Sequence, residues 1–135
     1  MQPAISISKI TPPRLHQIID RPHLFERLEH SQEKKLTLIL GQAAQGKSTL
    51  TATHSKHANI PTAWVNLQKE DADPTNLFFS IVHALHYVLQ GMDLLPLLNY
   101  PAVSLGPRLE RPLYREWVTA IFDCMSRPVQ IVLDG

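Results

Sequence analysis

The chain has 135 residues, of which 44% are hydrophobic and 19% are charged, so it is long enough to bury a core and is not a disordered polymer. Thirteen basic and 12 acidic side chains leave a formal net charge of +1, which gives no general electrostatic reason to expect nucleic acid or an anionic membrane as a partner. The single cysteine, Cys124, excludes an internal disulfide and a thiolate-rich metal site. The chain shows neither a signal peptide nor an apolar run of membrane-spanning length, and we expect a cytoplasmic protein.

Helix and strand patterns alternate in the first half of the chain. A proline near the start and apolar residues at helical spacing predict a short helix over residues 21–30. Residues 36–40 form a compact apolar run that ends at Gly41, which predicts a buried parallel strand. Residues 47–58 have the composition of a helix, and the β-branched and aromatic residues 62–67 predict a second strand.

The second half of the chain continues this pattern. Residues 68–76 are polar and predict a loop, in which Asp73 or Thr75 caps a helix that Gly91 ends. The apolar residues of this helix, over residues 77–89, cover one broad face. Four prolines rule out a long regular helix in residues 92–112. Helical spacing resumes over residues 113–126, and the apolar run of residues 129–133 predicts a third strand.

Eight consecutive residues between the first predicted strand and its helix match the phosphate-binding pattern G-x-x-x-x-G-K-[ST]. They are Gly41, Gln42, Ala43, Ala44, Gln45, Gly46, Lys47 and Ser48. Glycines let backbone N–H groups approach phosphate closely, and the helix N-terminus adds further N–H groups. We expect Lys47 to reach the β- and γ-phosphates, Ser48 to ligate Mg²⁺ and Thr49 to add a hydroxyl near the α-phosphate. The alternative is an ordinary strand-turn-helix connection that matches by accident.

Asp134 follows the last apolar run, where the carboxyl end of a strand meets the ligand in nucleotide-binding α/β proteins. We expect it to orient Mg²⁺, usually through a water molecule; a surface aspartate at a strand end is the alternative. The elements and both motifs predict an α/β protein with a three-layer P-loop NTPase fold and a parallel sheet, truncated after the strand that carries Asp134. Residues 1–30 would form a lead-in with a short helix, and residues 31–135 a partial nucleotide-binding domain. We expect ATP binding rather than hydrolysis, because no water-polarising carboxylate or arginine finger is identified.

Several other segments accompany the phosphate-binding motif. They are Lys9-Ile10-Thr11-Pro12-Pro13-Arg14-Leu15, Arg21-Pro22-His23-Leu24 with Leu28, Ala63-Trp64-Val65-Asn66-Leu67, and Glu70-Asp71-Ala72-Asp73-Pro74 with Phe78. This set resembles the opening of a STAND-class signalling ATPase and is most similar to the MalT-like, large ATP-binding regulators of the LuxR family. The ending Leu133-Asp134-Gly135 is also similar to the start of the acidic motif in NACHT-type members.

The resemblance implies a switch in which ATP binding controls assembly, while a separate C-terminal part binds DNA or a partner. This segment would then bind a nucleoside triphosphate and would contact neither nucleic acid nor a membrane directly. Self-association or downstream effector domains would belong to a full-length protein. Two other functions stay open: a small P-loop kinase or hydrolase, with residues 92–112 as its acceptor or lid segment, and a remnant that no longer binds nucleotide.

Two histidine pairs have a spacing that suits a metal ion on one helix face, namely His54 with His57 and His83 with His86. Neither pair has a third ligand in view, so solvated or partly packed helix faces are the simpler interpretation. Cys124 is interpreted as a small core residue.

Three acidic residues, Glu70, Asp71 and Asp73, follow the second predicted strand. At the carboxyl edge of a sheet they could approach nucleotide or Mg²⁺, but a solvated loop is the simpler interpretation. Trp64 and Trp117 are interpreted as core residues.

Overall fold

The computed structural model describes residues 5–14, 21–31, 46–57, 60–90, 94, 96, 111–125 and 127–135, without the side chains of residues 111–114. The chain forms two compact units. One, the sheet unit, consists of Met1–Pro12 and Ile60–Gly135, and the other, the helix-pair unit, is Pro13–Asn59.

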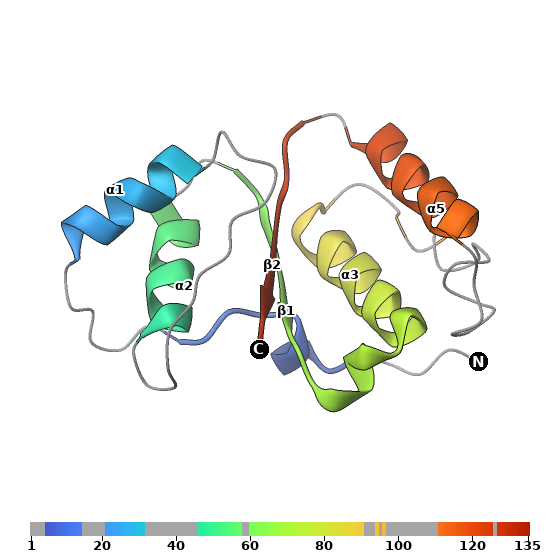
Figure 1. Ribbon diagram of the computed structural model, residues 1–135, viewed down its shortest axis with the longest axis horizontal. Helices are drawn as coiled ribbons and strands as arrows, with labels where there is room; N and C mark the ends of the chain where they lie inside the picture. Colours follow the sequence, from blue (N-terminus) through green and yellow to red (C-terminus); the bar gives the residue numbers. More distant parts are fainter. Residues whose placement is uncertain are drawn as a thin grey trace. The chain divides into compact units, whose positions relative to one another are not determined.

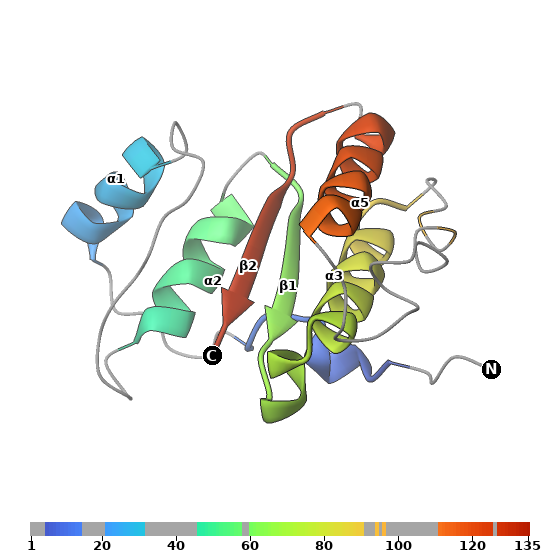
Figure 2. The same ribbon diagram turned by 45° about the vertical axis from the view of Figure 1, so that its right-hand side comes forward.

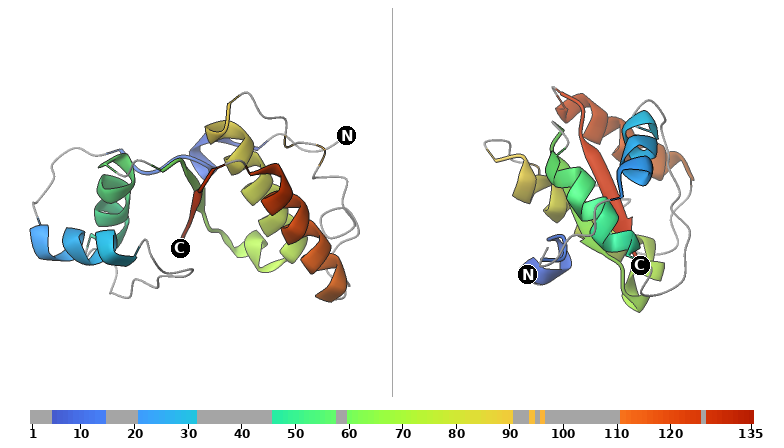
Figure 3. Two further views of the ribbon diagram at one scale, coloured as in Figure 1. Left: turned by 90° about the horizontal axis from the view of Figure 1, so that it is seen from above. Right: turned by 90° about the vertical axis from the view of Figure 1, so that its left-hand side faces the viewer.

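The sheet unit contains two parallel strands, β1 (Thr62–Asn66) and β2 (Gln130–Asp134), which lie side by side in Figure 1. The chain between them forms the 3-10 helix η2 (Lys69–Ala72) and the helices α3 (Pro74–Val88) and α5 (Arg111–Cys124). Both α-helices lie on the same side of the two strands (Figure 2), and they run next to each other (Figure 3). The predicted α/β class and parallel pairing are confirmed for this unit. The strand expected over residues 36–40 lies outside the described residues, so the three-layer P-loop fold stays a prediction.

The start of α3 shows how local sequence sets an element. The Asp73 carboxylate accepts the Thr75 N–H at 2.9 Å, and Pro74 occupies the first helical turn. An aspartate cap followed by proline is a strong helix start, because the cap satisfies a free N–H and proline lacks one. The helix therefore begins at Pro74, three residues earlier than the apolar spacing alone predicts. Residues 69–72, predicted as loop, form η2.

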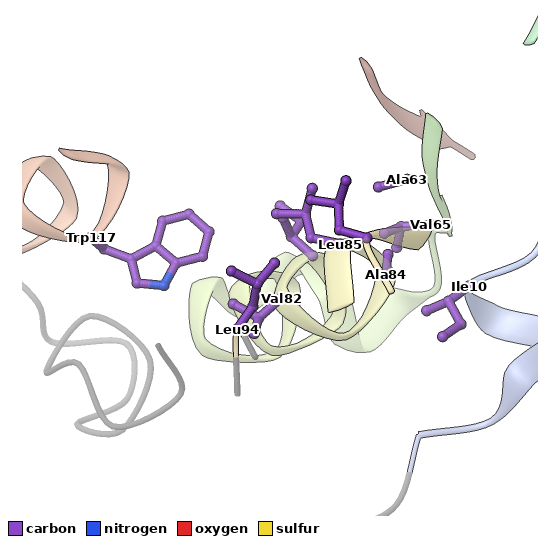
Figure 4. Packing of buried hydrophobic residues seen from close by; sticks show 10 residues of the cluster. Ile10, Ala63, Val65, Val82, Ala84, Leu85, Leu94 and Trp117 are labelled. Carbon is purple, nitrogen blue, oxygen red and sulfur yellow. The ribbon is translucent and has the colours of Figure 1, made fainter. Parts of the chain in front are cut away.

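The core of the sheet unit is built around α3. Ala63 and Val65 of β1 and Val82 and Ala84 of α3 are fully buried, and Leu85 is 1% exposed. Figure 4 shows these side chains together with Ile10, Leu94 and Trp117, gathered along the helix.

Aromatic residues of the sheet unit are also buried. Trp117 of α5 is 3% exposed and stacks on Phe78 of α3 with ring centroids 4.3 Å apart. Trp64 of β1 is 1% exposed, so the prediction that both tryptophans are core residues is confirmed. Cys124 is partly buried against the same core, as expected.

The helix-pair unit contains α1 (Pro22–Ser31) and α2 (Lys47–His57). Both helices match the predicted ranges to within one residue at each end, because a proline opens α1 and a glycine precedes α2. The N-terminal segment Met1–Pro12 belongs to the sheet unit and is called the lead-in from here on. It contains a short 3-10 helix, η1 (Ile7–Lys9), which the sequence did not predict. Among the described helices, none is both long enough and apolar enough to cross a membrane.

Candidate functional site

The described part of the phosphate-binding motif begins with Gly46, directly before α2. Gly46 has φ = +80°, a left-handed conformation that residues with a Cβ rarely adopt. Its carbonyl oxygen accepts the Leu50 N–H at 2.8 Å, so the turn leads straight into the helix. The backbone therefore requires a glycine at the position where the motif has its second one. Residues 41–45 lie outside the described residues, and their phosphate contacts stay a prediction.

The first turn of α2 contains Lys47, Ser48 and Thr49. The N–H groups of a first helical turn have no acceptor within the helix, and the helix dipole makes this end positive. No acidic side chain occupies the first turn of α2 to neutralise it. The local chemistry of this end, where Lys47 is the first helical residue, suits an anion with several oxygen atoms.

A second cation lies at this helix end. Arg21 precedes α1, and its carbonyl oxygen accepts the Phe25 N–H at 3.0 Å. Its guanidinium lies over Gly46, so that a Cβ on residue 46 would be 3.1 Å from Nη2 and 3.3 Å from Nη1. The Arg21 guanidinium thus adds positive charge next to the residue that precedes the positive end of α2.

The packing of α1 on α2 depends on polar and aromatic contacts. His54 of α2 is 2% exposed, and its Nε2 lies 3.0 Å from Oε1 of Glu29 on α1. The Phe25 ring meets His54 and His57 edge to face, with centroids 5.0 and 5.8 Å away. Both imidazoles thus serve the contact between the helices.

The second histidine pair lies on α3. The centroids of the Phe79 and His83 rings lie 4.4 Å apart. The His83 Nε2 is buried and has no hydrogen-bond partner among the described residues. Burial lowers the pKa of His83, and the nearby His86 lowers it further. In the part of the chain that the structure describes, no group of three His, Cys, Asp or Glu side chains could hold a metal ion.

The carboxyl ends of β1 and β2 place Asn66 and Asp134 opposite each other in the sheet register. The N–H of Leu67, the residue after β1, donates to the Asp134 carbonyl oxygen at 2.7 Å. Asp134 is thus the last residue of a parallel strand, as predicted. Ser48 belongs to the helix-pair unit and Asp134 to the sheet unit, so joint ligation of one Mg²⁺ stays a prediction.

An ion pair joins the lead-in to the chain that follows β1. The Lys9 Nζ lies 2.6 Å from Oδ2 of Asp71, and the two side chains are 14% and 3% exposed. Lys9 also donates to the backbone oxygen of Asn66 at 3.3 Å. We call Lys9, Asn66 and Asp71 the lead-in clamp. Asn66 is the last residue of β1, and η1, which ends at Lys9, lies beside that end of the strand (Figure 2). The interpretation as a solvated side chain holds for Glu70, which is exposed. It is wrong for Asp71, which is buried, and the Lys9 ammonium compensates the buried charge.

The Asn66 side chain completes the clamp. Its Nδ2 donates to the backbone oxygens of Ser8 and Thr11 at 2.8 and 2.9 Å, and its Oδ1 accepts the Trp64 indole N–H at 2.8 Å. Asn66 therefore ties β1 to an N-terminal segment that is 55 to 58 positions away in the sequence.

No family model matches the chain, and no solved structure matches it. An 88-residue stretch, 64% of this chain, is 33% identical to the HTH-type transcriptional regulator MalT of Vibrio cholerae serotype O1. This stretch covers 9% of the length of that regulator. The match agrees with the resemblance to MalT-like regulators over the residues that it covers.

Sequence reasoning did not assign Arg21, Lys9 or the Asn66 side chain a role at these sites. Arg21 stands directly before a proline at a predicted helix start, which indicates where its backbone lies but not where its side chain points. Lys9 and Asp71 are 62 positions apart, and no periodic pattern connects residues so distant.

Proposed function

We propose that this chain binds ATP together with Mg²⁺, as the N-terminal segment of a STAND-type signalling or transcription-regulatory ATPase. The observation that carries the proposal is the left-handed Gly46 directly before Lys47 at the start of α2. A sequence motif that matched by accident would not need a glycine with φ > 0 at this position, whereas a loop that wraps around phosphate does.

The residues of the helix-pair unit fit a triphosphate. The first-turn N–H groups of α2 would bind phosphate oxygens, and the Lys47 ammonium would contact the β- and γ-phosphates. The Arg21 guanidinium lies on the same side of Gly46 that a Cβ would fill, and it would contribute a second positive charge. Residues 41–45 would supply further backbone donors.

Two oxygen donors fit Mg²⁺, which prefers hydroxyl, carboxylate and water oxygens. Ser48 would ligate the ion through its hydroxyl, and Asp134, at the end of β2, would orient it, usually through a water molecule. Bound Mg²⁺ would neutralise phosphate charge. That Ser48 and Asp134 bind the same Mg²⁺ is inferred from the sequence motifs.

The regulatory part of the proposal rests on the similarity to MalT, which is described as a transcriptional regulator. In the longer protein that we propose, nucleotide binding by this segment would control assembly, and other domains would contact DNA or a partner. The segment itself would have no nucleic-acid site, in line with its net charge of +1.

Isothermal titration of the purified chain with Mg-ATP tests the nucleotide site. Lys47→Ala is expected to lower the affinity roughly 10- to 100-fold, because hydrogen bonds to charged groups are worth about 1.5–3 kcal/mol. Lys56→Ala is the matched control, since Lys56 is an exposed lysine on the same helix. Equal affinity of the Lys47→Ala variant and the wild-type chain would contradict the assignment of the phosphate site, and a wild-type chain that does not bind would support the remnant interpretation.

A further inference from the structure

The lead-in clamp contains a largely buried ion pair, formed by Lys9 and Asp71. Asp71 is almost fully buried, and its Oδ2 accepts both the Lys9 ammonium and the Gln68 N–H, at 2.6 and 2.7 Å. Buried ion pairs are weak sources of net stability, because the cost of removing two charges from water offsets their attraction. Their directional contacts do restrict geometry.

A continuous series of contacts leads from Lys9 to Asp134. Lys9 binds the carbonyl oxygen of Asn66, the last residue of β1. The next residue, Leu67, donates its N–H to the carbonyl oxygen of Asp134. Asp71 holds the other end of the same short turn through the Gln68 N–H. The clamp thus fixes the turn whose backbone binds Asp134.

Strand ends fray easily, since their terminal hydrogen bonds open at little cost. Asp134 is the last residue of β2, and it is partly exposed. A carboxylate on a frayed strand end would not keep a fixed distance to a metal ion. The Leu67 N–H and the clamp behind it oppose this fraying.

We propose that Lys9 and Asp71 are positioning residues for Asp134, and that the lead-in thereby sets how strongly Mg²⁺ assists nucleotide binding. This inference rests on the proposed function, because it takes Asp134 as the residue that orients Mg²⁺. It adds a dependence of the metal site on a residue 125 positions away in the sequence. The lead-in is then part of the nucleotide switch.

The first experiment needs no nucleotide. Amide hydrogen exchange, followed by NMR, reports the protection of the Leu67 N–H. Lys9→Met is expected to lower this protection more than that of amides in the middle of α3, whereas Lys9→Arg, which keeps the cation, is expected to preserve it. Glu29→Gln removes one partner of an ion pair in the other unit and is the matched control, with no expected change at Leu67. Unchanged Leu67 protection in Lys9→Met would overturn the inference.

The second experiment measures magnesium coupling, defined as the ratio of the ATP dissociation constants without and with Mg²⁺. Asp134→Asn is expected to reduce the coupling of the wild-type chain. Lys9→Met and Asp71→Asn are expected to reduce it roughly tenfold, the lower end of the effect of outer-shell partners on metal affinity. Their affinity for ATP without Mg²⁺ should stay close to wild type, and Lys9→Arg should restore the coupling.

The outcomes separate the two proposals. A wild-type chain that binds no ATP overturns both, and one that binds ATP with no loss of coupling in Asp134→Asn overturns the role of Asp134 and the inference with it. Coupling that Asp134→Asn reduces but Lys9→Met leaves intact overturns the inference alone. Circular dichroism checks that each variant folds. If Lys9→Met does not fold, Lys9→Gln, which keeps a hydrogen-bond donor but no charge, replaces it in both experiments.

Discussion

The contacts inside the sheet unit differ in kind from the contacts inside the helix-pair unit. In the sheet unit, the buried side chains are mostly apolar, and Val65, Val82 and Ala84 have no exposed surface. In the described part of the helix-pair unit, α1 has no buried residue, and α2 buries Ala52 and His54. The contacts described between these two helices include an ion pair and edge-to-face rings, and just before the helices the Arg21 guanidinium lies over Gly46.

The difference indicates where stability and ligand binding reside. Apolar burial is non-directional and grows with area, so it supplies most of the driving force for packing in the sheet unit. An ion pair with a partner as exposed as Glu29, whose side chain is 46% exposed, contributes little net stability and responds to nearby charge. We therefore expect an anionic ligand to stabilise the helix-pair unit more than the sheet unit.

The largest expected effect is that of Leu85→Ala in the core of the sheet unit. Leu85 is 1% exposed, and removing buried methyl groups leaves a cavity, so the free energy of unfolding should fall by about 2–5 kcal/mol. Leu133→Ala is the matched control, because Leu133 is 47% exposed, and it should cost less than about 1 kcal/mol. Denaturant unfolding followed by circular dichroism measures both. Similar losses for the two variants would contradict the view that apolar burial on α3 dominates.

A smaller effect is expected for Gly46→Ala in the helix-pair unit. The left-handed backbone at this residue should cost a residue with a Cβ about 1–2 kcal/mol. The Arg21 guanidinium would also be crowded, but it is the end of a flexible side chain and can move. Gly46→Asn separates the two causes, since asparagine has a Cβ yet tolerates this conformation better.

Thermal unfolding of both position-46 variants tests this expectation. The asparagine variant should lose less stability than the alanine variant. Equal losses would show that crowding against Arg21, rather than backbone conformation, demands a glycine here.

The smallest expected effect is a pH dependence that arises from His83. The pKa of His83 is lowered from its ordinary value of 6.5, first by burial and then by His86, so the folded state binds this proton less readily than the unfolded chain. At a pH well above 6.5 His83 is neutral in both states and does not affect the free energy of unfolding. As the pH falls below 6.5 towards the lowered pKa, the unfolded chain binds the proton first, and the folded state loses stability.

Variants at the two histidines of α3 test this sign. His83→Leu should reduce the loss of stability between about pH 7 and pH 5, and His86→Gln should reduce it by a smaller amount, since it removes the lesser cause. Denaturant midpoints measured across this range are the readout. A steeper loss in His83→Leu would contradict the assignment.

Much of the local structure could be predicted from the sequence. The ranges of α1 and α2 follow from their proline and glycine neighbours, and β1 from its run of β-branched and aromatic residues. Of the two caps that the sequence offers for α3, Asp73 and Thr75, the structure confirms Asp73, whereas the apolar spacing alone predicts a start three residues later. The contact between Arg21 and Gly46 could not be predicted, since a motif defines the backbone of its own residues and not the side chains that approach them.

By itself, the sequence determined the α-helices and the two described strands, the parallel α/β class, the glycine at position 46 and the place of Asp134 at a strand end, because these depend on the local backbone and on periodicity. Only the tertiary structure decided that Asp71 is buried against Lys9, that Asn66 holds the lead-in, and that the Arg21 guanidinium lies over Gly46. Each of these contacts joins residues far apart in the chain. Their formation depends on how the elements pack, which no spacing within a single element encodes.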